Sequence, residues 1–144
     1  GHKVDTILDV GCGAGELLPY LREERPGFFD INVGWSLNGQ EMGRTNYNVM
    51  YYSSAQQLAH HTSSGCPMRV GDLLGSGTIS GPTPDQTGAL LEMTGGGKTP
   101  VTVNGAARTF LQDGDTVALF ATAKGEGYTI GFGPCTGTVL PAEA

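Results

Sequence analysis

The sequence predicts an α+β domain dominated by β-strands, in which a mixed, roll-like or barrel-like sheet carries one main helix at about residues 46–64. Three observations support this fold class. Residues 30–37 alternate strictly between apolar and polar side chains, which is typical of a strand with one buried face. Residues 46–64 carry an apolar stripe at helical spacing. Most of the 24 glycines lie beyond residue 64, where short apolar runs alternate with turn residues.

The first strand is predicted from a clear pattern of alternation. Ile31, Val33, Trp35 and Leu37 occupy one face of residues 30–37, while the intervening residues are polar or glycine. Asn38-Gly39 follows directly, and this dipeptide favours a two-residue hairpin turn. We therefore expect a buried strand that turns back sharply on itself.

The main helix is predicted from apolar residues at steps of three and four. They are Tyr47, Met50, Tyr51, Ala55 and Leu58, and they predict a face that packs on the sheet. Thr45 or Asn46 can cap the start, and Gly65 with Pro67 ends the pattern.

The rest of the chain reads as short strands and turns. Asn104-Gly105 and Asp113-Gly114-Asp115 are the turn signals. Strands are predicted at residues 72–79, 89–94, 100–103, 108–111, 116–123, 128–132 and 137–140.

Composition excludes several classes of function. The 144 residues carry a formal net charge of −6, and an acidic surface without a basic run disfavours nucleic-acid binding. No apolar stretch approaches the roughly 20 residues that span a bilayer, so no membrane role is expected. Cys12, Cys66 and Cys135 are far apart, which argues against a disulfide framework or a zinc site and favours a cytoplasmic location.

Residues 4–18 have a different pattern from the remainder. An apolar run enters a turn at Gly11, Gly13 and Gly15, and a helix-like stretch follows. This segment resembles the first motif of S-adenosylmethionine-dependent methyltransferases. Such folds need several βαβ units, and the strand-rich remainder does not supply them. We therefore expect two parts, residues 1–18 as an N-terminal segment that resembles a methyltransferase motif and residues 19–144 as one domain.

Three groups of residues are candidates for chemistry. The segment 75–82 combines small residues and hydroxyls, which suits an anionic ligand but also suits a plain turn. Glu92 stands alone among apolar neighbours, which suits proton transfer. The same pattern also suits simple strand alternation with Glu92 facing water. His60 and His61 are adjacent on the predicted helix and point about 100° apart, so we interpret them as structural.

From about Pro19 to Pro141 the chain resembles the C-terminal third of the fumarylacetoacetases. The resemblance covers several segments in the right order and spacing, namely residues 29–32, 56–62, 71–74, 76–82, 113–115 and 127–133. The occurrence of 56–62 together with 76–82 is the most specific feature.

The resemblance implies a hydrolase that cleaves a carbon–carbon bond in the diketo acid fumarylacetoacetate, in tyrosine and phenylalanine catabolism. It implies that Thr78 contacts the substrate and that Glu92 is the catalytic carboxylate that orients a histidine. It also implies Mg²⁺ and/or Ca²⁺ as cofactor and a family-type homodimer. The family's metal-binding segments lie upstream of the matched region, so no metal ligand is assigned in this chain.

The chain is accordingly expected to be catalytically incomplete by itself. Two alternatives stay open at this point. One is an S-adenosylmethionine-dependent methyltransferase, which rests on residues 4–18, and the other is a non-catalytic fragment that keeps part of a pocket.

Overall fold

A computed structural model describes residues 23–143. The main sheet contains β3 (Ile31–Leu37), β4 (Gln40–Asn46), β7 (Thr116–Gly125), β8 (Tyr128–Gly131) and β9 (Cys135–Thr138). Two small ribbons accompany it, β1 (Glu23–Arg25) with β2 (Phe28–Phe29) and β5 (Val101–Val103) with β6 (Ala106–Arg108). The helical elements are η2 (Tyr47–Val49), α1 (Ser54–Ser63), η3 (Pro84–Gln86) and α2 (Leu90–Met93).

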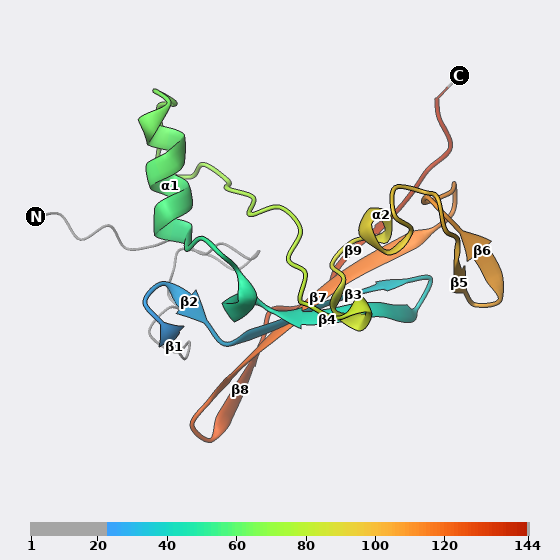
Figure 1. Ribbon diagram of the computed structural model, residues 1–144, viewed down its shortest axis with the longest axis horizontal. Coiled ribbons are helices and arrows are strands. Elements are labelled where there is room, and N and C mark those ends of the chain that lie inside the picture. The colour runs from blue at the N-terminus through green and yellow to red at the C-terminus, as the bar shows by residue number, and fades with distance from the viewer. Residues whose placement is uncertain (1–22, 144) are drawn as a thin grey trace, which may run out of the picture.

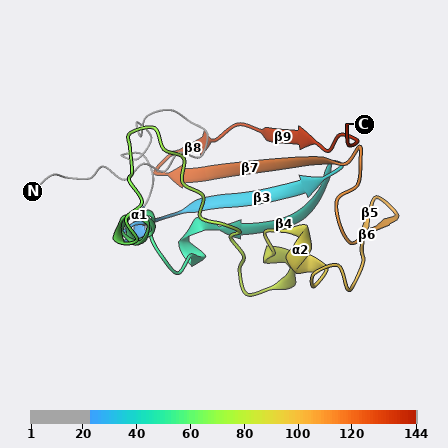
Figure 2. The ribbon, with the colours of Figure 1, turned by 90° about the horizontal axis from the view of Figure 1, so that it is seen from above.

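The main sheet has the order β4-β3-β7-β8, and β9 pairs with the other half of the same edge of β7 (Figure 2). Every strand pair in the described residues is antiparallel. The predicted α+β, β-dominated fold with one main helix is therefore confirmed. The sheet is open and antiparallel rather than mixed, and two-residue turns join β3 to β4 and β7 to β8, which permits antiparallel pairing.

The hairpin turns predicted at Asn38-Gly39 and Asn104-Gly105 are confirmed. Asn38 and Gly39 have φ values of 51° and 80°, and Asn104 and Gly105 have 48° and 82°. Two consecutive positive φ angles define the turn that matches the twist of a hairpin. The strand predicted at 30–37 is confirmed as β3, and its alternate residues Ile31, Trp35 and Leu37 are buried.

Two apolar clusters form the core on this face of β3. One contains Ile31, Tyr47, Ala121 and Ala123. The other contains Trp35, Leu37, Met42, Leu90 and Val103, so it joins the sheet to α2 and to the β5–β6 ribbon. These clusters hold the loop elements over one face of the sheet.

The main helix is shorter than predicted. Met50 has extended backbone after η2, and α1 begins at Ser54 rather than at residue 46. Ser53 caps α1, since its hydroxyl accepts from the Gln56 N–H at 3.3 Å and the Gln56 side chain accepts from the Ser53 N–H at 2.9 Å. Asn46 instead caps η2, where its side chain accepts from the Asn48 N–H.

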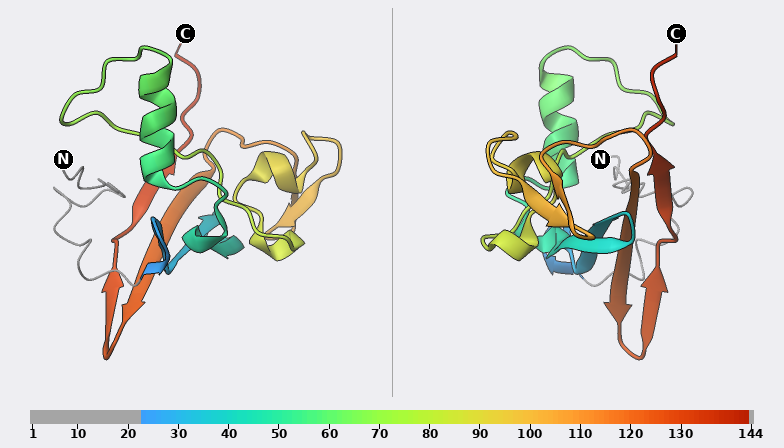
Figure 3. Two further views of the ribbon diagram at one scale, coloured as in Figure 1. Left: turned by 60° about the vertical axis from the view of Figure 1, so that its left-hand side comes forward. Right: turned by 90° about the vertical axis from the view of Figure 1, so that its right-hand side faces the viewer.

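The predicted packing face of the helix is also wrong. No residue of α1 is buried, and Tyr47, the buried member of the predicted stripe, belongs to η2. Figures 1 and 3 show α1 rising away from the main sheet. Within the described residues, the helix forms from its capping box and local hydrogen bonds rather than from burial of an apolar stripe.

Two predicted strands do not form. Residues 72–79 form no strand in the structure, and Gly71 and Gly77, with φ of 96° and 77°, interrupt any ladder. Residues 89–94 contain α2, because the Met93 and Thr94 N–H groups donate to the Ala89 and Leu90 carbonyls at 3.1 and 2.9 Å.

Four of the remaining strand predictions are confirmed. β5, β7 and β8 lie within or across the predicted ranges, and β9 begins two residues earlier than 137–140 implies. The strand predicted at 108–111 is wrong beyond Arg108, because β6 ends there and residues 109–111 pair with no strand. β4 was not predicted, because Gln40, Glu41 and Arg44 break its apolar alternation. Among the described residues, no helix has the length and apolar character required to cross a bilayer.

Candidate active site

Residues 78–92 form a loop that contacts β3 and β4 of the main sheet. The Trp35 indole Nε1 donates to the Thr87 carbonyl oxygen at 2.9 Å. The Thr87 backbone also lies so close to Gly43 on β4 that a Cβ at Gly43 would overlap its carbonyl oxygen. Glycine is therefore required at position 43, because a side chain there would overlap the loop backbone. These contacts keep the loop next to β3 and β4 (Figure 1).

Hydrogen bonds also join the two ends of this loop. The Gly81 N–H donates to the Gln86 carbonyl at 2.9 Å, and the Gly88 N–H donates to Ser80 Oγ at 3.0 Å. Ser80 Oγ in turn donates to Glu92 Oε2 at the middle of α2. The hydroxyl-rich segment and the carboxylate predicted from sequence are therefore brought into one hydrogen-bonded group.

Thr78 lies where two cavities meet. The first, which we call the sheet cavity, has a volume of about 710 Å³, and the second, the helix cavity, has about 750 Å³. Thr78 and Ile79 line both of them. The Thr78 side chain is exposed, so its hydroxyl is accessible to a ligand in either cavity.

The sheet cavity has mainly apolar walls from the sheet and from the segment after β8. Its side chains include Trp35, Phe120, Leu119 and Phe132. Thr45 also lines it, and the Thr45 hydroxyl is buried with no hydrogen-bond partner among the described residues. A concave apolar site with a few polar groups is the usual form of a small-molecule site.

Arg44 supplies the positive charge at this cavity. Its guanidinium lies 5.0 Å from the centre of the Phe120 ring and pairs with Glu41 at 2.7 Å. The hydrogen bond to Glu41 raises the pKa of Arg44, and the same bond lowers the pKa of Glu41. Because both side chains are about half exposed, the pair contributes little to stability.

The helix cavity lies between α1 and the segment 75–80. Its walls include Tyr51, Gln56, Ser76 and the two histidines. His60 and His61 are exposed, with ring centres 6.2 Å apart. They line this cavity, and their interpretation as structural residues stays a prediction.

Glu92 differs from its predicted environment. It lies on α2 rather than on a strand, and its side chain is exposed rather than surrounded by apolar groups. Sequence reasoning missed Ser80, Trp35 and Gly43 as the residues that bring Glu92 to the segment that carries Thr78. Ser80 lies inside the hydroxyl-rich segment 75–82, which was the available signal, whereas nothing local to Trp35 or Gly43 indicates their contact with Thr87.

The described residues do not fit a divalent metal ion. Mg²⁺ and Ca²⁺ need several oxygen ligands that converge on one point. Within residues 23–143, no group of three or more histidine, cysteine or acidic side chains is placed to hold an ion. Cys66 and Cys135 are exposed free thiols, and Cys12 and the methyltransferase-like residues 4–18 lie outside the described residues.

This is a β-dominated α+β domain in which an exposed threonine lines two cavities and a serine two residues further on holds a carboxylate by a hydrogen bond. Comparison with known proteins places it more closely. The family description "Fumarylacetoacetate (FAA) hydrolase C-terminal" matches residues 8–140, and the chain belongs to this family. The match begins at residue 8, whereas we expected the resemblance to begin at about Pro19.

Individual relatives agree with the family. The chain is 44% identical over 149 residues to a fumarylacetoacetase of Arabidopsis thaliana, covering 96% of this chain and 35% of that protein. It is 47% identical over 132 residues to a fumarylacetoacetase of Homo sapiens, covering 87% of this chain and 32% of that protein. The chain thus spans about a third of the length of these relatives.

Proposed function

We propose that an enzyme containing this chain hydrolyses the carbon–carbon bond of fumarylacetoacetate, which yields fumarate and acetoacetate. The observation that carries the proposal is 44% identity to the Arabidopsis fumarylacetoacetase across 96% of the chain. The position of Thr78 at both cavities and the hydrogen bond from Ser80 to Glu92 support it. The same proposal includes a role in tyrosine and phenylalanine catabolism, a cytoplasmic location and a homodimer.

The substrate-binding role falls to Thr78. Its hydroxyl is an exposed donor at the junction of the two cavities. A diketo acid presents carbonyl and carboxylate oxygens that accept such a hydrogen bond. The apolar walls of the sheet cavity suit the carbon chain between these oxygens.

The proton-transfer role involves Glu92. Hydrolysis adds the oxygen of water to a ketone carbon, and the electron pair of the broken carbon–carbon bond leaves on the acetoacetate fragment, which takes up a proton. A histidine base requires an orienting partner to keep its ring aligned, and a carboxylate provides this. We propose that Glu92 holds such a histidine, which another part of the enzyme supplies.

Family membership implies a metal-dependent enzyme. We propose Mg²⁺ and/or Ca²⁺ as the ion, with ligands supplied from outside the described residues, since the described residues do not fit one. The hydrogen bonds that we propose for Thr78 and Glu92 do not pass through that ion.

A hybrid enzyme tests the proposed function. This chain replaces the matching third of the Arabidopsis relative, and loss of fumarylacetoacetate is followed by ultraviolet absorbance with acetoacetate measured as product. We expect turnover within about tenfold of the parent enzyme. A hybrid that melts cooperatively, as the parent does, yet leaves the substrate intact would contradict the proposal.

A further inference from the structure

The hydroxyl of Ser80 has its hydrogen-bond directions determined by its two neighbours. The Gly88 backbone N–H can only donate, so Ser80 Oγ accepts from it at 3.0 Å. An ionised carboxylate can only accept. The single Ser80 proton is therefore committed to Glu92 Oε2.

The backbone around Ser80 is closely constrained. A Cβ at Gly88 would overlap the Ile79 carbonyl oxygen and would lie 2.8 Å from the Thr78 methyl group. Residues 78–80 and 87–88 consequently run in contact, and the Trp35–Thr87 hydrogen bond ties the second of these segments to the sheet. Ser80 thus presents its hydroxyl to α2 from a defined position.

The Glu92 carboxylate accepts a hydrogen bond from Ser80. Among the described residues, Ser80 Oγ is the hydrogen-bond donor found at the Glu92 carboxylate. Glu92 is exposed, and a carboxylate oxygen can accept more than one hydrogen bond, so the group can also accept from a histidine or water. An exposed glutamate without such a donor would sample several rotamers, which costs entropy when one orientation is required.

We propose that Ser80 is a positioning residue that holds the Glu92 carboxylate in its working orientation. This inference rests on the proposed function of Glu92. Because Ser80 and Glu92 are both exposed, the hydrogen bond contributes little to folding, and its main effect falls on the chemical step.

The test uses the hybrid enzyme with Ser80→Ala, Ser80→Thr and the matched control Ser63→Ala. Ser63 is an exposed serine whose hydroxyl donates to the His60 carbonyl at 2.7 Å. Ser80→Ala should lower kcat about 10- to 100-fold, as expected when a charged group loses a hydrogen bond, with KM and the melting temperature nearly unchanged. Ser80→Thr keeps the hydroxyl and should restore most of the turnover, and Ser63→Ala should behave as the parent hybrid.

A double-mutant cycle identifies the route by which Ser80 acts. In a Glu92→Gln background, Ser80→Ala should lower kcat by less than about threefold further, because the carboxylate it orients is already gone. An equal loss in both backgrounds, or unchanged kcat in an active hybrid, would overturn the inference.

Should the alanine variant fail to fold, Ser80→Val against Ser80→Thr makes the same comparison with side chains of one shape. An inactive but folded parent hybrid would instead overturn the proposed function itself.

Discussion

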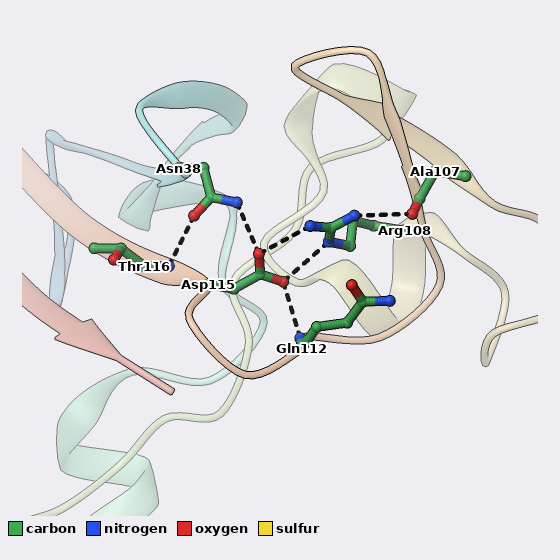
Figure 4. Close-up of polar contacts among 6 residues, drawn as sticks. All are labelled: Asn38, Ala107, Arg108, Gln112, Asp115 and Thr116. Atoms are coloured by element: carbon green, nitrogen blue, oxygen red, sulfur yellow. Dashed lines mark hydrogen bonds and ion pairs between the residues drawn. The ribbon is translucent and has the colours of Figure 1, made fainter. Parts of the chain in front are cut away.

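The guanidinium of Arg108 faces the carboxylate of Asp115 through two hydrogen bonds, from Nε to Oδ2 at 3.1 Å and from Nη2 to Oδ1 at 3.2 Å (Figure 4). Asn38 donates to the same carboxylate at 2.7 Å, and the Gln112 N–H donates at 2.9 Å. Asp115 is 3% exposed. One carboxylate therefore joins the β3–β4 turn, the end of β6 and the start of β7, which places the β5–β6 ribbon on the sheet.

This carboxylate should make stability depend on pH. The hydrogen bond from Arg108, followed by those from Asn38 and the Gln112 backbone, lowers the pKa of Asp115 from 3.8 to about 2. Its stabilising contribution is thus fully present above its ordinary pKa and is lost as pH falls through about 2. We expect the melting-temperature difference between the parent chain and Asp115→Asn to be largest at pH 5–7 and to shrink between pH 4 and 2. The fluorescence of Trp35, the single tryptophan, reports unfolding.

Asp113→Asn is the control for Asp115, because Asp113 is an exposed carboxylate in the same turn. It should leave the pH dependence of the parent chain intact. A pH-independent difference between the parent and Asp115→Asn would show that the charge of Asp115 does not stabilise the fold.

Glu92→Gln should lower kcat of the hybrid enzyme by about 100- to 10,000-fold, with a smaller change in KM. Glutamine keeps the shape but removes the charge that supports a histidine base, and general-base contributions are typically of this size. Steady-state kinetics on fumarylacetoacetate provide the measurement. Glu126→Gln, in the exposed β7–β8 turn, is the matched control. Parent-like kinetics in the Glu92 variant would show that Glu92 is a surface residue of α2 without a catalytic role.

Thr78→Val should act on substrate binding. Valine keeps the volume of threonine but removes the donor, so we expect KM to rise about 5- to 10-fold for the loss of one hydrogen bond of typical strength. The control is Thr129→Val on exposed β8, which should change neither constant. A fall in kcat with KM unaltered would assign Thr78 to the chemical step instead.

Gly43→Ala should displace the loop that carries the site. The added Cβ would overlap the Thr87 carbonyl oxygen and lie 3.0 Å from Trp35 Nε1. Overpacking of this kind typically costs about 1–3 kcal/mol, so the chain should melt earlier and Trp35 fluorescence should shift. Gly131→Ala is the control, because a Cβ there meets no atom within 4 Å. Equal behaviour of the two variants would contradict the close approach between β4 and Thr87.

The 144-residue chain alone should not hydrolyse fumarylacetoacetate at a useful rate. Hydrolysis requires an activated water, a positioned base and groups that hold the substrate, and the proposal gives this chain only the last of these together with Glu92. The measurement is loss of substrate with added magnesium or calcium. Metal-dependent turnover that Glu92→Gln abolishes would show that this chain assembles a complete site.

Local features of the sequence were sufficient for the hairpin turns and the central strand. Asn38-Gly39 and Asn104-Gly105 adopt positive φ angles because asparagine and glycine tolerate that region better than other residues. The alternation of Ile31, Trp35 and Leu37 predicted which face of β3 is buried. The turn dipeptides and the alternation depend on neighbouring residues alone, so both can be interpreted without knowledge of the rest of the fold.

The sequence by itself also determined the family, through the segments that resemble fumarylacetoacetases. Tertiary structure decided where the candidate residues lie. The apolar run around Glu92 suits a strand or a helix equally, and Leu90 of the helix α2 joins the same apolar cluster as Trp35 and Val103. The meeting of Ser80 with Glu92 depends on Thr87 resting on Gly43 and Trp35. These contacts join residues far apart in the chain, and no local periodicity encodes a contact between surfaces that only folding brings together.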